Sequence, residues 1–267
     1  MSDKVQSKGE ELHAFSPQHD SQAALSLAVS NSAEAAALRA EILHAGRKLW
    51  ERQYVDGNGG NISVRLGSDY LLCTPTMVSK ADMNPADICL ANMAGEILVG
   101  SRQRTSEILL HLEIYKANPR ARAVVHCHSP YATAYAATAS APPCGYITEV
   151  ELFIGPAAVA PYETPGTLAF AKTVIPFVRK HNTILLANHG VVCWSNTVTH
   201  TEWLVEIFEN YCKTFQIAQQ IGRPLRRIPD HKIQEILECK RRAGFPDARM
   251  PDEWIDNLPQ LPASFSN

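Results

Sequence analysis

The chain has 267 residues, of which 45% are hydrophobic and 19% charged, and its formal net charge is -2 at pH 7. This length and composition predict a globular protein with one large domain or two small ones. The nearly balanced charge provides no basic face for nucleic acid. No apolar run approaches the ~20 residues of a membrane helix, so we expect neither a nucleic-acid nor a membrane partner.

The first segment, residues 1–32, is rich in Ser, Gln, Ala and acidic residues and predicts a mobile N-terminal extension. A weak apolar patch at 23–29 could instead form a short docking helix. Apolar residues at helical spacing then predict a helix over 35–54. It runs into a glycine-rich turn over 56–61, where glycine permits positive φ values.

Beyond this turn, short segments rich in β-branched residues alternate with helical segments, and Gly, Asn and Pro separate them. Several strands are joined by turns of hairpin length, so the sheet should be mixed and largely antiparallel. We therefore expect one three-layer α/β/α domain over 33–244, followed by an irregular tail over 245–267 that contains four prolines. Further strands are expected at 62–66, 70–73, 88–93, 96–99, 146–152, 157–160, 183–187 and 191–194, and further helices at 107–116, 131–139, 166–180, 198–221 and 231–242.

A pair of histidines two residues apart, His126 and His128, stands where an apolar strand ends. The β-branched residues Val124 and Val125 predict that strand, and side chains at i and i+2 of a strand point to the same face. Two imidazoles held side by side in this way are typical of a divalent transition-metal site. For a lone histidine, a satisfied position in the core would be the better interpretation.

A metal site on this pair needs a third ligand, and His189 is the strongest candidate. It lies next to Gly190 in a tight turn between two apolar segments, where a side chain can point into a cleft. The other seven histidines fall in predicted helices or at predicted surfaces. Three neutral imidazoles would leave one coordination position open, as in catalytic zinc sites.

Two further segments each have two interpretations. Thr105, Ser106 and Glu107 open a predicted helix whose free N–H groups and hydroxyls suit an anion. The same residues also form an ordinary helix cap, with the acid offsetting the helix dipole, and from the residues alone this is the better interpretation. Gly60 and Asn61 belong either to a simple turn or to a backbone nest for phosphate.

Five motifs in register then indicate a family resemblance. In chain order they are GNISVR at 60–65, TPT at 74–76, TSE at 105–107, HCH at 126–128 and NHG at 188–190. With these motifs the chain resembles the class II aldolase/adducin family over roughly residues 35–240, and it is most like the L-fuculose-1-phosphate aldolases of that family. Each motif is weak alone, but five in this order are highly specific.

The resemblance implies an α/β/α domain that assembles as a C4 homotetramer with active sites at subunit interfaces. It implies one zinc ion per subunit on His126, His128 and His189, although other divalent transition metals suit the same ligands. Glu107 takes the place of the family's acid/base, and Tyr146 that of the tyrosine that protonates the aldehyde oxygen. The residues expected to bind the substrate phosphate are Gly60, Asn61, Thr76, Met77, Thr105 and Ser106.

Three positions depart from the family pattern. Met77 stands where the phosphate loop usually has glycine, and Pro165 replaces an aromatic residue that shapes the aldehyde pocket. A C-terminal tyrosine has no clear match, since Ala243 and Phe245 lie in that region. The pattern therefore leaves the aldehyde partner open.

The activity implied by the resemblance is that of a zinc-dependent aldolase, a carbon–carbon lyase that reversibly cleaves a small phosphorylated sugar such as L-fuculose 1-phosphate. The products are dihydroxyacetone phosphate and an aldehyde, formed through a metal-stabilised enediolate. Alternatives on the same fold are a methylthioribulose-phosphate dehydratase, a tetronate-phosphate decarboxylase and a pentulose-phosphate 4-epimerase, although the epimerases usually carry aspartate in place of Glu107. An adducin-like scaffold without activity would not need the three ligands and the acid.

The seven cysteines are scattered, odd in number and mostly flanked by apolar residues, and they form no C-x-x-C pair. They predict reduced thiols in a cytoplasmic protein rather than a disulfide framework. The N-terminus lacks a basic segment followed by a long apolar core, so no secretory signal is expected.

Overall fold

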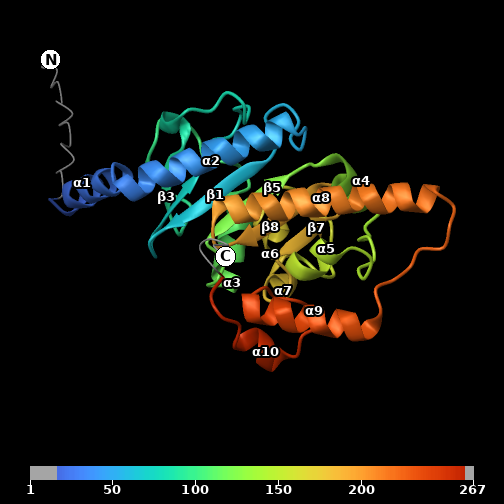
Figure 1. Ribbon diagram of the computed structural model, residues 1–267. Helices are drawn as coiled ribbons and strands as arrows, with labels where there is room; N and C mark the ends of the chain where they lie inside the picture. The colour runs from blue at the N-terminus through green and yellow to red at the C-terminus, as the bar shows by residue number, and fades with distance from the viewer. Residues whose placement is uncertain (1–16, 262–267) are drawn as a thin grey trace, which may run out of the picture.

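Eight strands form one mixed sheet at the centre of the protein (Figure 1). The structure is a computed structural model and describes residues 17–261. Across the sheet the strands follow the order β4-β3-β2-β1-β5-β8-β7-β6. Their bounds are β1 (Asn61–Leu66), β2 (Tyr70–Cys73), β3 (Cys89–Asn92), β4 (Ile97–Val99), β5 (Ala123–Cys127), β6 (Ala158–Ala160), β7 (Thr183–Leu186) and β8 (Gly190–Ser195).

Neighbouring strands of this sheet are antiparallel, except for β6 and β7, which run parallel. The predicted hairpins β1–β2, β3–β4 and β7–β8 are all present. In the middle of the sheet β5 lies between β1 and β8, so that His126 is opposite Asn61 on one side and Val192 on the other. The prediction of a mixed, largely antiparallel sheet is therefore confirmed.

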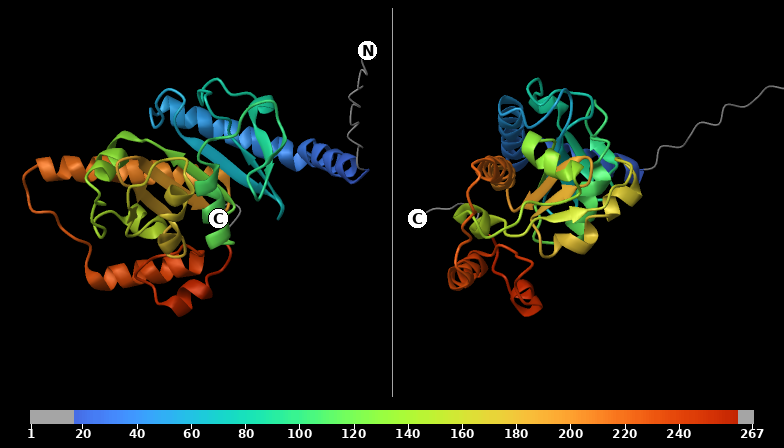
Figure 2. Two further views of the ribbon diagram at one scale, coloured as in Figure 1. Left: turned by 180° about the vertical axis from the view of Figure 1, so that it is seen from behind. Right: turned by 90° about the vertical axis from the view of Figure 1, so that its right-hand side faces the viewer.

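Helices cover both faces of the sheet and complete the three layers (Figure 2). One face carries α2 (Ala33–Glu51), α4 (Pro130–Ala137) and α8 (Val198–Gln220). The other face carries α3 (Ile108–Ala117), α6 (Leu168–Lys172) and α7 (Ile175–Val178). The α/β/α architecture expected from the sequence is thus confirmed.

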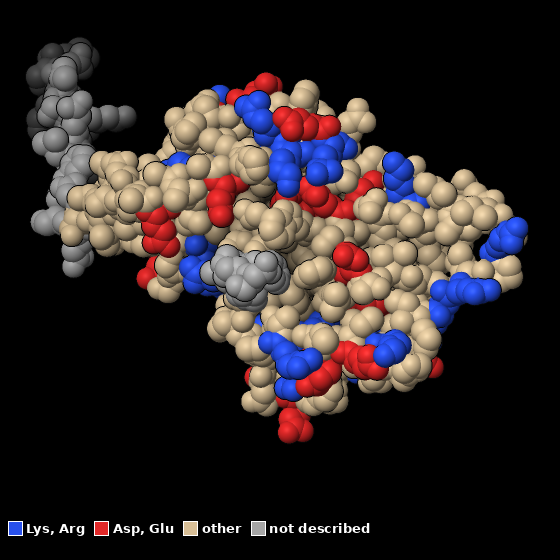
Figure 3. Space-filling view, viewed as in Figure 1, with Lys and Arg blue, Asp and Glu red and all other residues tan. Residues whose placement is uncertain are grey.

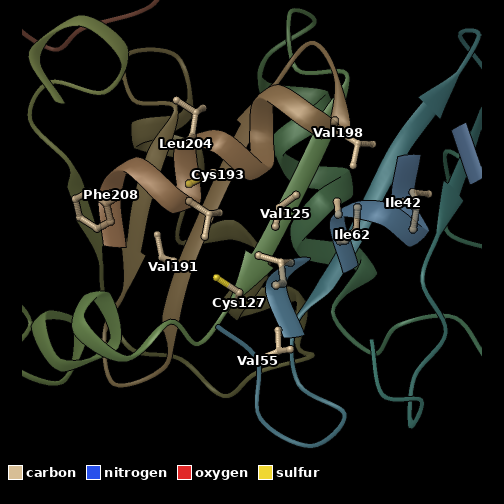
Figure 4. Close-up of a cluster of buried hydrophobic side chains, with 14 of the residues drawn as sticks. Ile42, Val55, Ile62, Val125, Cys127, Val191, Cys193, Val198, Leu204 and Phe208 are labelled. Atoms are coloured by element: carbon tan, nitrogen blue, oxygen red, sulfur yellow. The ribbon is translucent and has the colours of Figure 1, made fainter. Parts of the chain in front are cut away.

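The alternation of side chains along the central strands divides the core between the two faces. Val125 and Cys127 of β5 pack in the cluster that contains Phe208 of α8 (Figure 4). Val124, which directly precedes Val125, points to the opposite face and packs with Trp194 in the cluster on the α3 side. Because β5 is buried on both faces, the residue at its carboxyl end is held rigidly, and that residue precedes His128.

Five further helices complete the described residues. They are α1 (Pro17–Ser30), the 3-10 helix η1 (Pro85–Asp87), α5 (Thr148–Phe153), α9 (Asp230–Ala243) and α10 (Asp252–Asp256). Helices α9 and α10 lie together at the lower end of the molecule in Figure 1. Within residues 17–261, every helix is too short or too polar to span a membrane.

The charges on the surface are mixed. Figure 3 shows Lys and Arg side chains next to Asp and Glu side chains over the face that carries α2 and α8. Some of these charges pair between the two helices, since Lys48 Nζ lies 2.9 Å from Glu206 Oε1. On this face, the pattern is one of paired surface charges rather than a stripe of one sign.

Two predictions of secondary structure are wrong. Residues 146–152 were expected to form a strand, but α5 occupies Thr148–Phe153, because the helix buries Val150 and Ile154, which are four residues apart. The single helix expected over 166–180 is divided into α6 and α7. Pro176 has no backbone N–H to bond to residue 172, so a continuous helix cannot pass through it.

The terminal segments are only partly covered by the described residues. Of the predicted extension, residues 1–16 lie outside them, and residues 17–30 form α1, in line with the alternative of a short helix. The tail expected to be irregular contains α10, and Phe245, Ile255 and Leu261 are buried, while residues 262–267 lie outside the described range. The domain bounds at 33 and 244 remain a prediction.

Candidate metal centre and active site

Three histidines meet where the central strand β5 ends and its neighbour β8 begins. His126 lies on β5, His128 follows directly after it, and His189 immediately precedes β8. Because β5 and β8 pair antiparallel, the end of β5 and the start of β8 lie side by side. One ring nitrogen from each histidine lies within 4.8 Å of the others, so the three rings form a group that could hold a metal ion.

Hydrogen bonds at Nδ1 determine the tautomers of His126 and His128. His126 Nδ1 lies 2.9 Å from the carbonyl oxygen of Val191, and His128 Nδ1 lies 2.8 Å from Asp56 Oδ1. Both partners accept, so each Nδ1 carries the proton and each Nε2 has a free lone pair. These two Nε2 atoms face each other at 3.1 Å.

Two converging lone pairs repel unless something positive lies between them. Ligands at tetrahedral positions around zinc, each about 2.0–2.1 Å from the ion, lie about 3.3 Å apart, close to this separation. Burial also lowers the pKa of His126 well below its usual range. A histidine that binds a metal is usually neutral, and its other ring nitrogen donates a hydrogen bond to a carbonyl or carboxylate oxygen. His126 and His128 both have this form, so the residues fit a bound metal.

His189 completes the group from the turn between β7 and β8. Asn188 before it adopts a left-handed conformation with φ 57, which asparagine tolerates better than most residues. The ring packs against Phe170, with 5.4 Å between centroids, and burial lowers the pKa of His189. Its buried Nδ1 has no hydrogen-bond partner within residues 17–261, whereas its Nε2 faces Glu107.

Two glycines let the backbone approach these rings closely. A Cβ atom at Gly190 would collide with the carbonyl oxygen of Cys127 and lie 3.0 Å from Cδ2 of His128. Gly60 has φ +69, and its Cβ would lie 2.6 Å from Val55 Cγ1 and 3.0 Å from the carbonyl oxygen of His126. The glycine-rich turn and the NHG motif therefore both serve to bring the chain against the histidines.

The carboxylate of Glu107 faces the histidine group. This residue immediately precedes α3 and is only 6% exposed. Its Oε2 lies 3.3 Å from His126 Nε2, and its Oε1 lies 3.4 Å from His189 Nε2. Asn61 Nδ2 donates to Oε2 at 2.8 Å. An acid in this place can exchange a proton with a molecule bound beside the histidines.

A polar cavity of about 170 Å³ opens beside Glu107. Three loops and the start of α3 surround it, and it is lined by Asn58, Gly59, Gly60, Asn61, Pro75, Thr76, Thr105, Ser106, Glu107, His128 and His189. Behind the loop that contains Asn58 lies Lys80, which is 2% exposed and donates to the carbonyl oxygens of Asn58 and Val78, both at 3.2 Å. Burial lowers the pKa of Lys80 to about 8. No acid of the described chain forms an ion pair with this lysine within 4 Å.

The structure brings together most of the residues that the sequence singled out. The three histidines, Glu107 and all but one of the predicted phosphate residues line the cavity or its metal group. The exception is Met77, which is 77% exposed and adopts φ 57, a left-handed conformation that glycine reaches at lower cost. Tyr146 is not among the residues that line the cavity. Its ring packs against Phe215, with 5.5 Å between the ring centroids.

Other residues of the site do not follow from the sequence pattern. Asp56 binds His128, Lys80 underlies the cavity, and His111 is fully buried in α3. Glu107, His111 and Tyr115 are spaced by four residues, which is a signal for one helix face. In a helix of mostly apolar residues, that spacing alone does not distinguish a functional row from ordinary packing.

Comparison with known proteins places this site within a well-populated group. The family model for the class II aldolase and adducin N-terminal domain matches residues 40–215, which include every residue of the cavity. The 5-deoxy-D-ribulose 1-phosphate aldolase of Bacillus thuringiensis is 30% identical over 209 residues, covering 78% of this chain and 96% of that protein. The 3-oxo-tetronate 4-phosphate decarboxylase of Haemophilus influenzae is 31% identical over 73% of this chain and 93% of that protein. A solved L-fuculose 1-phosphate aldolase superposes with a TM-score of 0.70 and 27% identity, over 78% of this chain and 96% of that one.

Proposed function

The chain belongs to the class II aldolase and adducin family, and on that premise we propose that it is a metal-dependent aldolase acting on a ketose 1-phosphate. The products in the cleavage direction are dihydroxyacetone phosphate and an aldehyde. The observation that carries the proposal is the buried carboxylate of Glu107, held within 3.4 Å of two of three converging imidazoles. A scaffold protein would have no need of this arrangement.

The ligands of the metal would be His126, His128 and His189, the three residues that could hold an ion. A set of three imidazoles favours zinc, although Co²⁺, Mn²⁺ or Fe²⁺ would suit the same nitrogens. A bound ion would supply a Lewis acid that polarises the carbonyl group of the substrate. The hydrogen bonds of His126 to Val191 and of His128 to Asp56 hold both rings in the orientation that this needs.

Glu107 supplies the proton transfer. In the direction of condensation its carboxylate takes a proton from the hydroxylated carbon next to the carbonyl of dihydroxyacetone phosphate. The electron pair of that C–H bond forms the enediolate, whose carbon attacks the aldehyde. The aldehyde oxygen then takes a proton, and cleavage follows the same path in reverse.

The polar cavity binds the phosphate group in this proposal. Thr76, Thr105 and Ser106 line it with their hydroxyl groups, together with the turn at Gly60. The N-terminus of α3, a helix of 10 residues, also points its dipole at the cavity. Lys80 adds a buried positive charge behind the loop, so the electrostatic environment favours a phosphate dianion.

The predicted proton donor, Tyr146, would act across a subunit interface. Within one chain its ring packs against Phe215 rather than at the cavity. A C4 tetramer that brings Tyr146 of one subunit to the cavity of the next would reconcile its position with its predicted role.

Seven free cysteines, five of them buried, fit a cytoplasmic location.

The direct test is cleavage of L-fuculose 1-phosphate, L-rhamnulose 1-phosphate and 5-deoxy-D-ribulose 1-phosphate by the zinc-loaded protein. Release of dihydroxyacetone phosphate is the readout. The matched variant Glu107→Gln should keep zinc and lose about 10²- to 10⁴-fold in turnover, the usual size of a general-base contribution. Equal turnover in Glu107→Gln and the parent would contradict the role of this acid.

A second candidate is decarboxylation of a 3-oxo-tetronate 4-phosphate. It is favoured by the Haemophilus influenzae relative, which is 31% identical to this chain, against 30% for the Bacillus thuringiensis aldolase. The same carboxylate and cavity would serve, because loss of CO₂ from a 3-oxo acid also leaves an enediolate that must be protonated. Release of CO₂ from this substrate, with no cleavage of the ketose 1-phosphates, would replace the first proposal with the second.

A further inference from the structure

Glu107 is the first member of a row of buried polar side chains that leads away from the histidines. His111 and Tyr115 are four residues apart on α3 and so share one face of the helix, and Glu107, four residues before His111, is the N-cap residue of that helix. Asn61 and Ser63 are two residues apart on β1 and so share one face of the strand. The two sets interleave, and each of the five residues is at most 6% exposed.

Four hydrogen bonds join these side chains into what we term the Glu107–Tyr115 chain. Asn61 Nδ2 lies 2.8 Å from Glu107 Oε2, and Asn61 Oδ1 lies 2.5 Å from His111 Nε2. The other ring nitrogen, His111 Nδ1, lies 2.7 Å from Ser63 Oγ. Ser63 Oγ in turn lies 2.8 Å from the hydroxyl of Tyr115. No other side chain intervenes between Glu107 and Tyr115 along this path.

The chemistry of the groups gives the chain one direction. An ionised Glu107 can only accept, so Asn61 must present its N–H to it, and the amide oxygen then accepts from Nε2–H of His111. Burial lowers the pKa of His111 to about 3, so the ring is neutral and has a single proton. His111 Nδ1 therefore accepts from Ser63, whose oxygen accepts from the hydroxyl of Tyr115. Every donor points towards Glu107.

We propose that His111, Ser63 and Tyr115 are positioning residues that act through Asn61 to hold the Glu107 carboxylate in the orientation for proton transfer. The oxygen that accepts from Asn61 is also the one that lies 3.3 Å from His126 Nε2. The position of Glu107 Oε2 relative to the histidines thus depends on the side-chain amide of Asn61. The orientation of this amide depends in turn on the imidazole of His111. Buried hydrogen bonds in series polarise one another, so a change at Tyr115 reaches Glu107. The inference rests on the role proposed for Glu107.

The first test measures the direction of the chain without any turnover. In zinc-loaded protein labelled with ¹⁵N-histidine, NMR distinguishes a protonated from an unprotonated ring nitrogen, and the variant His111→Gln identifies the signals of His111 by their loss. The expected form is the neutral Nε2–H tautomer between pH 6 and 9. An Nδ1–H tautomer would reverse the chain, place an acceptor against Glu107 and overturn the inference.

The second test separates positioning from structural support. Zinc-loaded parent protein is expected to exchange a carbon-bound hydrogen of dihydroxyacetone phosphate for deuterium in D₂O, a half-reaction that needs no aldehyde. His111→Leu should lower kcat for exchange by about 10²-fold, the size expected when a reacting group is misplaced by ~1 Å, with KM and zinc content unchanged. His111→Gln keeps a donor that can reach Asn61, so it should recover part of kcat.

Two further variants keep the test decisive if His111→Leu does not fold. Tyr115→Phe removes one hydroxyl at the far end of the chain and should lower kcat in the same direction by a smaller factor. Thr201→Val removes the side-chain hydrogen bond of a fully buried residue in α8, outside the chain, and should lower only the melting temperature. If His111→Leu and Tyr115→Phe behave like Thr201→Val, the row is structural and the inference fails.

The proposed function can fail separately. If parent protein with bound zinc exchanges no hydrogen of dihydroxyacetone phosphate, the proposed activity is contradicted. An Nε2–H tautomer in the same protein would still support the direction of the chain, because the NMR measurement needs no substrate.

Discussion

Replacing Asp247 with asparagine should destabilise the protein by about 3–5 kcal/mol, the cost of leaving a buried charge without its partner. Asp247 and Lys240 are both fully buried, and Lys240 Nζ lies 2.9 Å from Asp247 Oδ2. Arg249 donates to both oxygens of the same carboxylate and also pairs with buried Glu151 of α5, at 2.7 Å. This network therefore holds the segment after α9 against the body of the domain.

The pKa of Asp247 gives a second measure of the same interaction. Burial by itself would raise this pKa, but the hydrogen bonds from Arg249 and the charge of Lys240 outweigh it and lower it from 3.8 to about 2. At 1.36 kcal/mol per pKa unit, this corresponds to roughly 2 kcal/mol of stability. Because the folded pKa lies below the unfolded one, this stability is present above about pH 5 and is lost as the pH falls towards 2.

Urea denaturation followed by tryptophan fluorescence, at several pH values between 3 and 7, would measure both effects. The difference in unfolding free energy between parent and Asp247→Asn should be constant above about pH 5 and shrink below it. Asp252→Asn is the matched control, because Asp252 pairs with Arg179 and Lys180 at the exposed surface and should change stability little. A loss for Asp247→Asn no larger than that of the control, or one that does not depend on pH, would refute the reasoning.

Three other variants test the site. His128→Ala should lose bound zinc, measured by metal analysis after dialysis, whereas His200→Ala, a histidine outside the metal group, should retain it. Lys80→Met should weaken competitive inhibition by inorganic phosphate by at least about tenfold, because at an effective dielectric of ~20 a unit charge is worth about 1.4 kcal/mol or more out to ~12 Å. In the parent, inhibition should also weaken above about pH 8 as this lysine loses its proton, and the variant should lack that change. Gly190→Ala should lose zinc and about 1–3 kcal/mol of stability, because its Cβ would collide with the carbonyl oxygen of Cys127; zinc retained with unchanged stability would contradict this.

Local signals account for most of the correctly predicted fold. The period of apolar residues identified α2, α3, α8 and α9, and short β-branched segments identified most of the strands. The errors arose where tertiary contacts overrode the local pattern. Residues 148–153 alternate poorly and are β-branched in part, but the helix is favoured because Val150 and Ile154 reach the core together while Glu151 meets Arg249.

The group of three histidines could be predicted from the sequence for a geometric reason. Side chains two residues apart on a strand share a face, so His126 and His128 predict a common site without knowledge of the fold. A tight turn that ends in glycine made His189 a candidate for the third ligand. That the three meet depends on the antiparallel pairing of β5 with β8, which no local pattern specifies.

The sequence by itself therefore determined the architecture, the family and the residue types that carry the proposed chemistry, because these depend on periodicity and on motifs read along the chain. Only the tertiary structure decided which side chains meet. It placed Asn61 between Glu107 and His111, Asp56 behind His128, and Lys80 beneath the cavity. These contacts join residues 22 to 72 positions apart. Their partners are selected by strand register and helix packing, which depend on the whole folded chain rather than on any short stretch of sequence.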